Sequence, residues 1–364
     1  MDIRQIAQKT LDVLEKNRSR AAIGFLLLFF CSVGLMYFVL SGKTRQTPES
    51  QSVSTNIQVP QESHLRPRHL DGILVPTGEE AQIPFAVMIE NHPDARPLSG
   101  LSKAQVVIEA PVEGGITRFM AIFDPSTEAE EIGPVRSARP YYVEWADSWH
   151  AFYAHVGGSP DGLALIRTKH YLSDLDQFRY GNTFWRSIQR SAPHNVYTNM
   201  TQLTEHATAT PSSETELPLG WRFQVSTSGT TPGKDAEIAI PYGGSFDASW
   251  KFDAEQQDYI RYQNGSKQKD KDGSIVTAKN IVVIETETKV LDSKGRLKLR
   301  TAGEGHAIGF RNGEHYALTW SKTENGLISF QLDGNDYVLA PGTTWMEVVT
   351  DKMDDVRIKE RVET

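Results

Sequence analysis

The chain is nearly free of cysteine, since Cys31 is the only one in 364 residues. A single cysteine excludes an intramolecular disulfide framework and a metal site built from cysteines. The sequence also lacks an H-E-x-x-H motif, a phosphate-binding P-loop and a dinucleotide-binding fingerprint. Its net charge of −8 is spread along the chain, which argues against a nucleic-acid binder. We therefore expect no metal, no cofactor and no nucleic-acid partner.

One stretch, Ala21 to Leu40, carries no charge over twenty residues. As a helix it would be about 30 Å long, which matches the hydrocarbon core of a bilayer. Basic residues such as Lys16 and Arg20 precede it, so residues 1–20 are expected in the cytoplasm and the rest outside. A cleaved signal peptide is the alternative, but no small-x-small cleavage pattern follows the stretch. The sequence predicts a single-pass membrane protein with an extracytoplasmic folded part.

Three regions of different composition follow the predicted membrane helix. Residues 41–66 are rich in Ser, Thr, Gln, Glu and Pro, which predicts a flexible linker. Residues 67–224 alternate short apolar runs with helical patterns, which predicts an α/β layered domain. Residues 232–350 hold short alternating runs beside Asn-Gly and Asp-Gly turns, which predicts a mostly antiparallel β domain. The expected fold class is α+β, and the charged tail after residue 350 is expected to fray.

Apolar runs and capping residues locate the individual elements of the first domain. Ser159 suits the N-cap of a helix, and Pro160 suits its first turn. In the second domain, GFRNGEHYALTW (309–320) is the clearest hairpin. Strands are expected within 83–91, 104–112, 116–124 and 150–158, and helices within 139–149, directly after Ser159, and within 197–208.

Polar residues gather in four stretches of the first domain: PVRSARPYY (134–142), HVGGSPDG (155–162), LIRTKHYLSDLD (165–176) and YGNTFWRSIQRSAPHNVYT (180–198). Ligand sites in α/β domains lie at the carboxyl ends of strands. Glycines before a helix N-terminus favour anions, and arginines bind carboxylate or phosphate in bidentate fashion. Histidines donate or transfer protons near neutral pH. The candidate ligand-binding residues are Arg136, Ser137, Arg139, His155, Gly157, Gly158, Ser159, Arg167, Arg186, Arg190, His194 and Asn195.

These residues also have a structural interpretation. Arg136 and Arg139 would pair with carboxylates and hold loops in place; the carboxylates considered are Glu109, Glu113 and Asp174. His155, on an apolar strand, would be a core histidine with its hydrogen bonds satisfied. The GGSP stretch would be only a helix start. Both interpretations remain open at the level of the sequence.

A hydrolase is a further alternative. GGSPDG comes close to the G-x-S-x-G nucleophile elbow, but Asp161 stands in place of the last glycine. A catalytic site would need Ser159 as nucleophile with His155 or His194 as its base. An enzyme would therefore show a base within about 3 Å of a nucleophile, whereas a binding protein needs only convergent arginines and backbone N–H groups.

Longer motifs give the chain a family resemblance. IGPVRSARPYYVEWA, HVGGSP, SAPHNVYT and, further on, GHAIGFRNGEHYALTWSK and YVLAPGTTWMEVV resemble the YerB-like lipoproteins of bacterial cell envelopes. The resemblance covers about residues 70–350, and it implies paired N- and C-terminal domains of undetermined activity, tethered outside the membrane. The typical member is anchored through a lipidated cysteine after a small-residue lipobox. Cys31 follows Leu28-Phe29-Phe30, so here a membrane helix is expected to replace the lipid.

A shorter part of the chain resembles the LytR-CpsA-Psr enzymes, which attach glycopolymers to peptidoglycan. It consists of ITRFMAIFDPSTEAEEIGPVRSARPYYVE and the following HAFYAHVGG. This resemblance implies that Arg136 and Arg139 would hold the phosphates of a polyprenyl pyrophosphate. That group also holds a magnesium ion through an aspartate. Thr117 and Arg118 stand where the group usually has an acidic residue, so no metal or transfer reaction is predicted from it.

The favoured hypothesis is a membrane-anchored, extracytoplasmic binding protein of the bacterial cell envelope. It would recognise an anionic or glycan cell-wall ligand, or a peptide, through the arginines and the GGSP stretch. The alternative is a cell-wall glycopolymer transferase or hydrolase.

Overall fold

The computed structural model describes residues 64–212, 217–224, 233, 235–350 and 352–360, which all belong to one compact unit. Residues 1–20, the predicted membrane helix at 21–40 and the linker up to residue 63 lie outside the described residues. Among the helices that are described, none has the length and apolar character needed to cross a bilayer.

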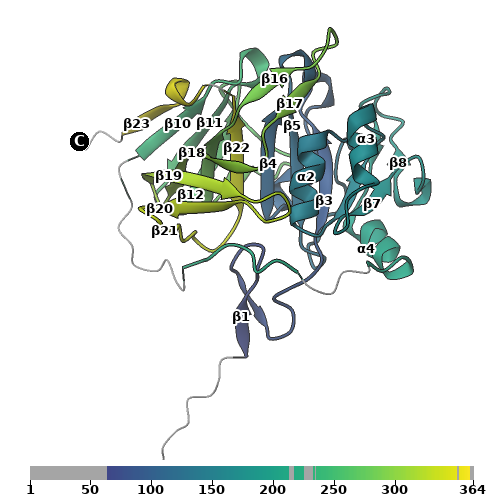
Figure 1. Ribbon diagram of the computed structural model, residues 1–364, viewed down its shortest axis with the longest axis horizontal. Helices are drawn as coiled ribbons and strands as arrows, with labels where there is room; N and C mark the ends of the chain where they lie inside the picture. The colour runs from purple at the N-terminus through teal and green to yellow at the C-terminus, as the bar shows by residue number, and fades with distance from the viewer. Residues whose placement is uncertain (1–63, 213–216, 225–232, 234, 351, 361–364) are drawn as a thin grey trace, which may run out of the picture. The chain divides into compact units, whose positions relative to one another are not determined.

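A mixed sheet of 11 strands runs through both halves of the sequence (Figure 1). Across the sheet the order is β21 (Asn335–Asp336), β20 (Ser329–Leu332), β19 (Glu314–Lys322), β18 (Gly303–Arg311), β15 (Asn280–Glu285), β22 (Thr344–Val349), β4 (Val106–Pro111), β5 (Thr117–Phe123), β3 (Phe85–Glu90), β6 (Phe152–His155) and β7 (Ser173–Asp176). Strand β22 joins the halves because it pairs in parallel with β15 on one side and β4 on the other. Both stretches that we expected as domains therefore contribute to one sheet.

Strand direction defines the edge on which the functional residues lie. Strands β15, β22 and β4 are parallel, and so are β3, β6 and β7, while β5 runs antiparallel between β4 and β3. All these strands except β5 therefore end at the same edge, which we call the carboxyl edge. Glu90 of β3, His155 of β6 and Asp176 of β7 are the last residues of their strands there.

The central strands are buried on both faces, which explains their nearly continuous apolar sequences. Every residue of β3 is buried. On one face, Met88 and Met120 belong to the same core cluster as Tyr142 of helix α2 (Pro140–Ser148). On the other face, Ile89 shares a cluster with Trp250 of the second sheet. Figure 1 shows α2 and α3 (Pro160–Ile166) on the same side of the large sheet.

The second sheet contains β13 (Ser266–Lys267), β12 (Asp258–Gln263), β11 (Ala248–Asp253), β10 (Asp235–Ile240) and β23 (Arg357–Glu360), with β14 (Thr277–Ala278) paired to β12. The expectation that the tail after residue 350 frays is wrong for β23, which pairs antiparallel with β10. Its charges alternate with Ile358, which packs against the core, and Lys359 pairs with Glu237 at 3.2 Å. The high proportion of charged residues in this segment concealed the alternating pattern of a strand.

Most of the expected local elements are confirmed. The strands within 83–91, 104–112, 116–124 and 150–158 are β3, β4, β5 and β6, and the helices are α2, α3 and α4 (Met200–Ala209). Asn312 and Gly313, with φ of 51° and 73°, form the turn of the predicted hairpin between β18 and β19. Short pairs complete the described part: β1 (Leu65–Pro67) with β2 (Leu74–Pro76), β8 (Trp185–Arg186) with β9 (Val196–Tyr197), and β16 (Thr288–Val290) with β17 (Leu297–Leu299). The described chain is α+β.

Candidate functional site

The segment 134–139 lies along the carboxyl edge between the end of β3 and the loop after β6. The Glu90 N–H donates to the Pro134 carbonyl at 3.0 Å, and the Val156 N–H donates to the Arg136 carbonyl at 3.0 Å. The backbone of this segment thus holds two parts of the fold together. Its arginine side chains remain for other contacts.

Arg136 faces the carboxylate of Glu90, which is itself buried. The Arg136 Nε lies 3.0 Å from Glu90 Oε1, while the ring Nδ1 of His194 lies 2.7 Å from Glu90 Oε2. Arg136 also donates to the Pro193 carbonyl at 3.2 Å. One carboxylate therefore brings together two predicted site residues that lie far apart in the sequence.

Arg139 pairs with Glu113, one of the carboxylates considered from the sequence. The contact is bidentate, with Nε 2.6 Å and Nη2 2.8 Å from the two carboxylate oxygens. Burial alone would raise the pKa of Glu113, but the hydrogen bond and charge of Arg139 outweigh it and lower that pKa. Glu113 lies on a turn with Gly114 and Gly115, both at positive φ. In this conformation Arg139 thus pairs with a carboxylate, as its structural interpretation expected.

Arg118 is a functional candidate that the sequence analysis did not include. It is 6% exposed on β5, directly opposite Glu90 of β3, and its Nη1 donates to the Ser137 carbonyl at 2.8 Å. Burial and, next, the charges of Arg139 and Arg136 together lower the pKa of this guanidinium to about 10. Among the described residues it forms no ion pair within 4.0 Å. The signal in the sequence was one charged residue within TRFMAIF, a strand that is buried throughout.

Both ring nitrogens of His155 contact groups within the fold. Its Nδ1 lies 2.8 Å from the Gly157 carbonyl, and its Nε2 lies 2.8 Å from the Asp174 carboxylate. Asp174, considered as a partner for the arginines, thus contacts a histidine, and the Gly157 N–H donates to Asp176 at 2.9 Å. His155 is fully buried and serves to connect the ends of β6 and β7.

The GGSP stretch forms a helix start, as the structural interpretation expected. The Ser159 hydroxyl accepts a hydrogen bond from the Gly162 N–H at 3.2 Å, and Gly158 forms a β-bridge with Ala138. Helix α3 is only 7 residues long, so its dipole provides little attraction for an anion. The ring nitrogens of His155 contact other groups, and no hydrogen bond links His155 to Ser159 in the described structure. His194, the other base considered, has its Nδ1 on Glu90, so among the described residues neither histidine is hydrogen-bonded to Ser159 in this conformation.

The remaining candidates lie in two different places. Arg167 is exposed at the C-terminal end of α3, the opposite end from Ser159. Arg186, the last residue of β8, donates at 3.0 Å to the side chain of Asn195, which lies in the loop between β8 and β9. In the same loop, Arg190 donates to two backbone carbonyls, those of Asp94 and Pro97, at 2.9 and 2.8 Å.

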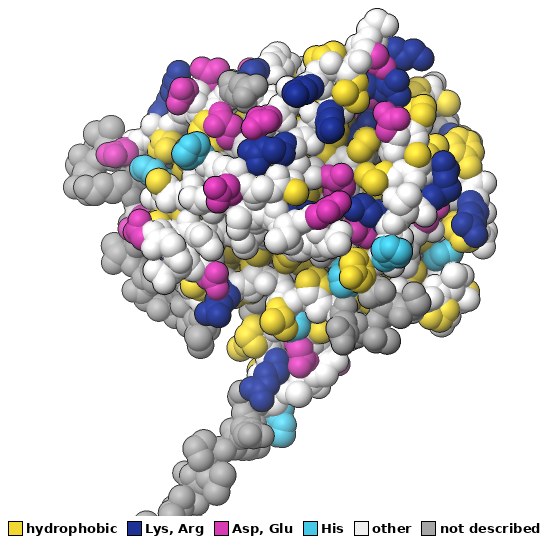
Figure 2. All heavy atoms as spheres, in the orientation of Figure 1, with side chains coloured by type: hydrophobic (Ala, Val, Ile, Leu, Met, Phe, Trp, Pro, Cys, Tyr) yellow, Lys and Arg dark blue, Asp and Glu magenta, His cyan; other side chains and the backbone are white. Residues whose placement is uncertain are grey.

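The structure thus groups three guanidinium groups with two carboxylates, which we call the edge cluster: Arg118, Arg136, Arg139, Glu90 and Glu113. Its formal charge is +1 when all five groups are ionised. Figure 2 shows basic and acidic side chains interspersed over the visible face of the molecule, so no broad patch of one sign marks a site there. The charge imbalance of the edge cluster arises from Arg118 alone.

Two family comparisons match the two halves of the chain. The family described as "Protein of unknown function (DUF3048) N-terminal domain" matches residues 70–213, and its C-terminal counterpart matches residues 238–346. The chain belongs to the DUF3048 family. The edge cluster lies entirely within the N-terminal DUF3048 region, whereas the paired strands β15 and β18–β21 come from the C-terminal one.

A relative from Bacillus subtilis (strain 168) carries the name "Putative lipoprotein YerB". It is 34% identical over 275 residues, which cover 74% of this chain and 81% of the relative. The crystal structure of the YerB protein from Bacillus subtilis is also similar, with a TM-score of 0.72 and 29% identity. That similarity covers 80% of this chain and 98% of the crystallised chain. The expected resemblance to YerB-like proteins is confirmed.

Proposed function

We propose that this protein is a membrane-anchored binding protein of the bacterial cell envelope, and that the edge cluster binds an anionic group of its ligand. The group is a phosphate or carboxylate carried by an envelope component. The predicted helix at 21–40 would anchor the chain, and the name of the Bacillus subtilis relative, a lipoprotein, supports an envelope location.

The observation that carries the proposal is the environment of Arg118. A buried charge costs several kcal/mol unless an opposite charge or several hydrogen bonds offset it. Arg118 offers five N–H donors, yet it has one hydrogen bond, with the Ser137 carbonyl, and the charges of Arg139 and Arg136 act unfavourably on it. An anion would supply the missing charge and accept the remaining N–H groups.

The neighbouring ion pairs are compatible with such a ligand. The Glu90 and Glu113 carboxylates occupy Arg136 and Arg139 in the described conformation. Glu113 lies on a turn with two glycines at positive φ, and a Cβ at Gly115 would meet no atom within 4 Å. Open space lies beside this turn, and a ligand anion would compete with Glu113 for Arg139.

The test is a titration of the full chain, purified in detergent, with inorganic pyrophosphate and, separately, with soluble peptidoglycan fragments. Arg118→Met should weaken binding of the anion about 10- to 100-fold, because charge-assisted hydrogen bonds contribute about 1.5–3 kcal/mol. Arg167→Met removes the same charge from an exposed position at the end of α3 and should leave the affinity unchanged.

Circular dichroism and thermal unfolding would confirm that both variants are folded before affinities are compared. The proposal fails if the wild type binds neither probe, or if Arg118→Met and Arg167→Met weaken binding equally. Selective loss of pyrophosphate binding would identify a phosphate ligand, and selective loss of fragment binding would identify a carboxylate or glycan ligand.

A further inference from the structure

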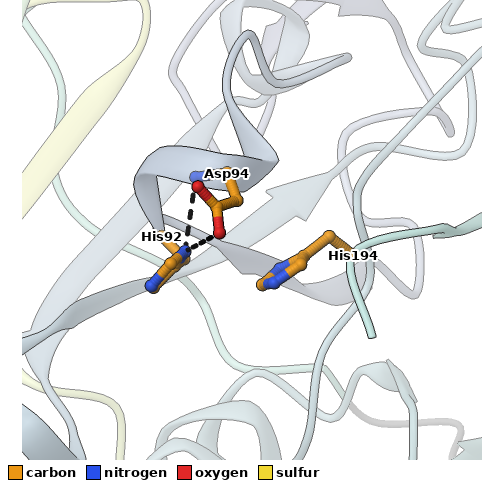
Figure 3. A group of neighbouring side chains, drawn as sticks. All are labelled: His92, Asp94 and His194. Atoms are coloured by element: carbon orange, nitrogen blue, oxygen red, sulfur yellow. Dashed lines mark hydrogen bonds and ion pairs between the residues drawn. The ribbon is translucent and has the colours of Figure 1, made fainter. Parts of the chain in front are cut away.

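Two histidines and an aspartate meet beside the edge cluster, although they come from distant parts of the chain. His92 and Asp94 follow the end of β3, and His194 lies in the loop between β8 and β9. One potential ligand atom from each residue lies within 4.8 Å of those of the other two. Figure 3 shows the Asp94 carboxylate beside the His92 ring, with the His194 ring facing both.

Glu90 orients one of these histidines. Its buried carboxylate lies 2.7 Å from His194 Nδ1, which favours the tautomer that has its proton on Nδ1 and its lone pair on Nε2. Arg136 pairs with the other oxygen of Glu90 at 3.0 Å. A carboxylate that accepts the second ring N–H is the usual companion of a metal-binding histidine, because it fixes the tautomer and raises the basicity of the ligand nitrogen.

His92 presents its lone pair on the same side as Asp94. Its Nδ1 accepts a hydrogen bond from the Asp94 N–H at 3.3 Å, and the same nitrogen lies 3.6 Å from Asp94 Oδ2. An unprotonated nitrogen and a carboxylate oxygen at this separation are two potential ligands facing one position.

Arg190 fixes the two loops relative to each other. It extends from the loop that carries His194 and donates to the backbone carbonyls of Asp94 and Pro97, at 2.9 and 2.8 Å. The cluster therefore rests on a held backbone, which reduces the entropy that ligand binding would cost.

We infer that His92, Asp94 and His194 bind a divalent late first-row transition-metal ion, with Zn²⁺ as the representative. Imidazole nitrogen suits Zn²⁺, Cu²⁺ and Ni²⁺, whereas Mg²⁺ and Ca²⁺ prefer an all-oxygen shell. Three protein ligands leave at least one coordination position open to water or to an external anion. This site is separate from the role proposed for Arg118.

Binding requires one adjustment of the side chains. The two imidazole rings stack, with centroids 5.1 Å apart and an interplanar angle of 20°. Lone pairs lie in the ring planes, so nearly parallel rings do not aim at a common point. The His92 side chain is 34% exposed and has room to rotate, whereas Glu90 holds His194 in place. Metal binding would thus separate the stacked rings.

The experiment is isothermal titration of the metal-stripped full chain in detergent with ZnCl₂. The wild type should bind one Zn²⁺ at this site, and His92→Ala, Asp94→Asn and His194→Ala should each weaken it by at least about tenfold. His170→Ala removes another exposed histidine and should leave the affinity unchanged. Cys31 is present in every variant, so differences among them report the cluster.

His92 and Asp94 are the informative positions because neither is buried, and their variants should unfold at the wild-type temperature without metal. Arg118→Met should retain Zn²⁺ binding even if it loses the anion, which separates this inference from the proposed function. The inference is overturned if the wild type shows no saturable Zn²⁺ binding, or if His170→Ala weakens binding as much as His92→Ala and Asp94→Asn do.

Discussion

Two buried arginines of this protein have opposite surroundings. Arg261 of β12 is fully buried, forms an ion pair with Glu109, and lies 3.9 Å from Glu347. Its guanidinium also lies over three aromatic rings, those of Phe119, Trp250 and Trp345. Arg118 of β5 is nearly as buried, but its hydrogen-bond partner is a single backbone carbonyl.

We interpret this difference as one between a structural charge, Arg261, and a charge proposed to bind a ligand, Arg118. Carboxylates, amides and aromatic faces offset the burial of Arg261, and the protein provides all of them. No comparable set of partners is described around Arg118, and under our proposal an anion from outside the chain would offset its burial. A buried arginine with incomplete partners is therefore a stronger indication of a ligand than an exposed one.

The largest expected effect is on protein stability, through the buried network of Arg261, Glu109 and Glu347. Arg261→Met leaves the carboxyl groups of Glu109 and Glu347 buried beside each other without a cation. We expect the free energy of unfolding in urea to fall by about 3–5 kcal/mol. Lys267→Met, an exposed position on the same sheet, is the control and should change it by less than about 0.5 kcal/mol. Equal small effects would mean that Arg261 is not the partner that stabilises this network.

The pH dependence of stability provides a second test. Burial, and next the charge of Glu109, raise the pKa of Glu347 well above its usual range. The folded state therefore holds a proton that the unfolded state releases. The proton on Glu347 stabilises the folded state fully below about pH 4.5, the pKa of this group in the unfolded chain. That stabilisation is lost as the pH rises through the higher pKa of the folded state.

Glu347→Gln should reduce the loss of stability at rising pH. The amide replaces the O–H of the protonated carboxyl with an N–H that does not titrate. The measurement is the free energy of unfolding of both proteins between pH 5 and pH 9. Identical slopes for wild type and variant would contradict a Glu347 whose pKa is raised in the folded state.

The smallest effect concerns the edge cluster. Glu113→Gln removes the carboxylate that competes for Arg139, so the affinity for inorganic pyrophosphate should increase roughly two- to fivefold. Glu205→Gln on α4 removes an exposed carboxylate elsewhere and should leave the affinity for pyrophosphate unchanged, because salt screens a distant surface charge. Weaker binding by Glu113→Gln would show that the ion pair supports the site and does not compete with the ligand.

Local elements were predictable because their signals are local. The apolar runs of β3–β6, the Ser159 cap and the Asn312-Gly313 turn lie within a few residues of the structures they specify. The position of β22 between β15 and β4 was not predictable, since it depends on pairing between distant segments. Strand β23 was missed because its charged residues concealed an alternating pattern.

The candidate site was predictable only in part, for the same reason. Arg136 and His194 were selected from their composition and position, but Glu90, which joins them, was not. Arg118 and Glu90 share one signal, a charged residue in an otherwise apolar strand. That pattern indicates a buried charge, and it tells nothing about the partner until the fold is known.

The most direct test compares the stability of wild type and Arg118→Met with and without inorganic pyrophosphate. Without the anion, the variant should be as stable as the wild type to within about 1 kcal/mol, since it loses an incompletely paired buried charge. At pyrophosphate concentrations 100 times the wild-type dissociation constant, the wild type should gain about 2.7 kcal/mol, and the variant, which binds about 10- to 100-fold more weakly, only about 0.4–1.4 kcal/mol. A variant that loses several kcal/mol without the anion, beside a wild type that gains nothing from it, would make Arg118 a structural residue and contradict the account.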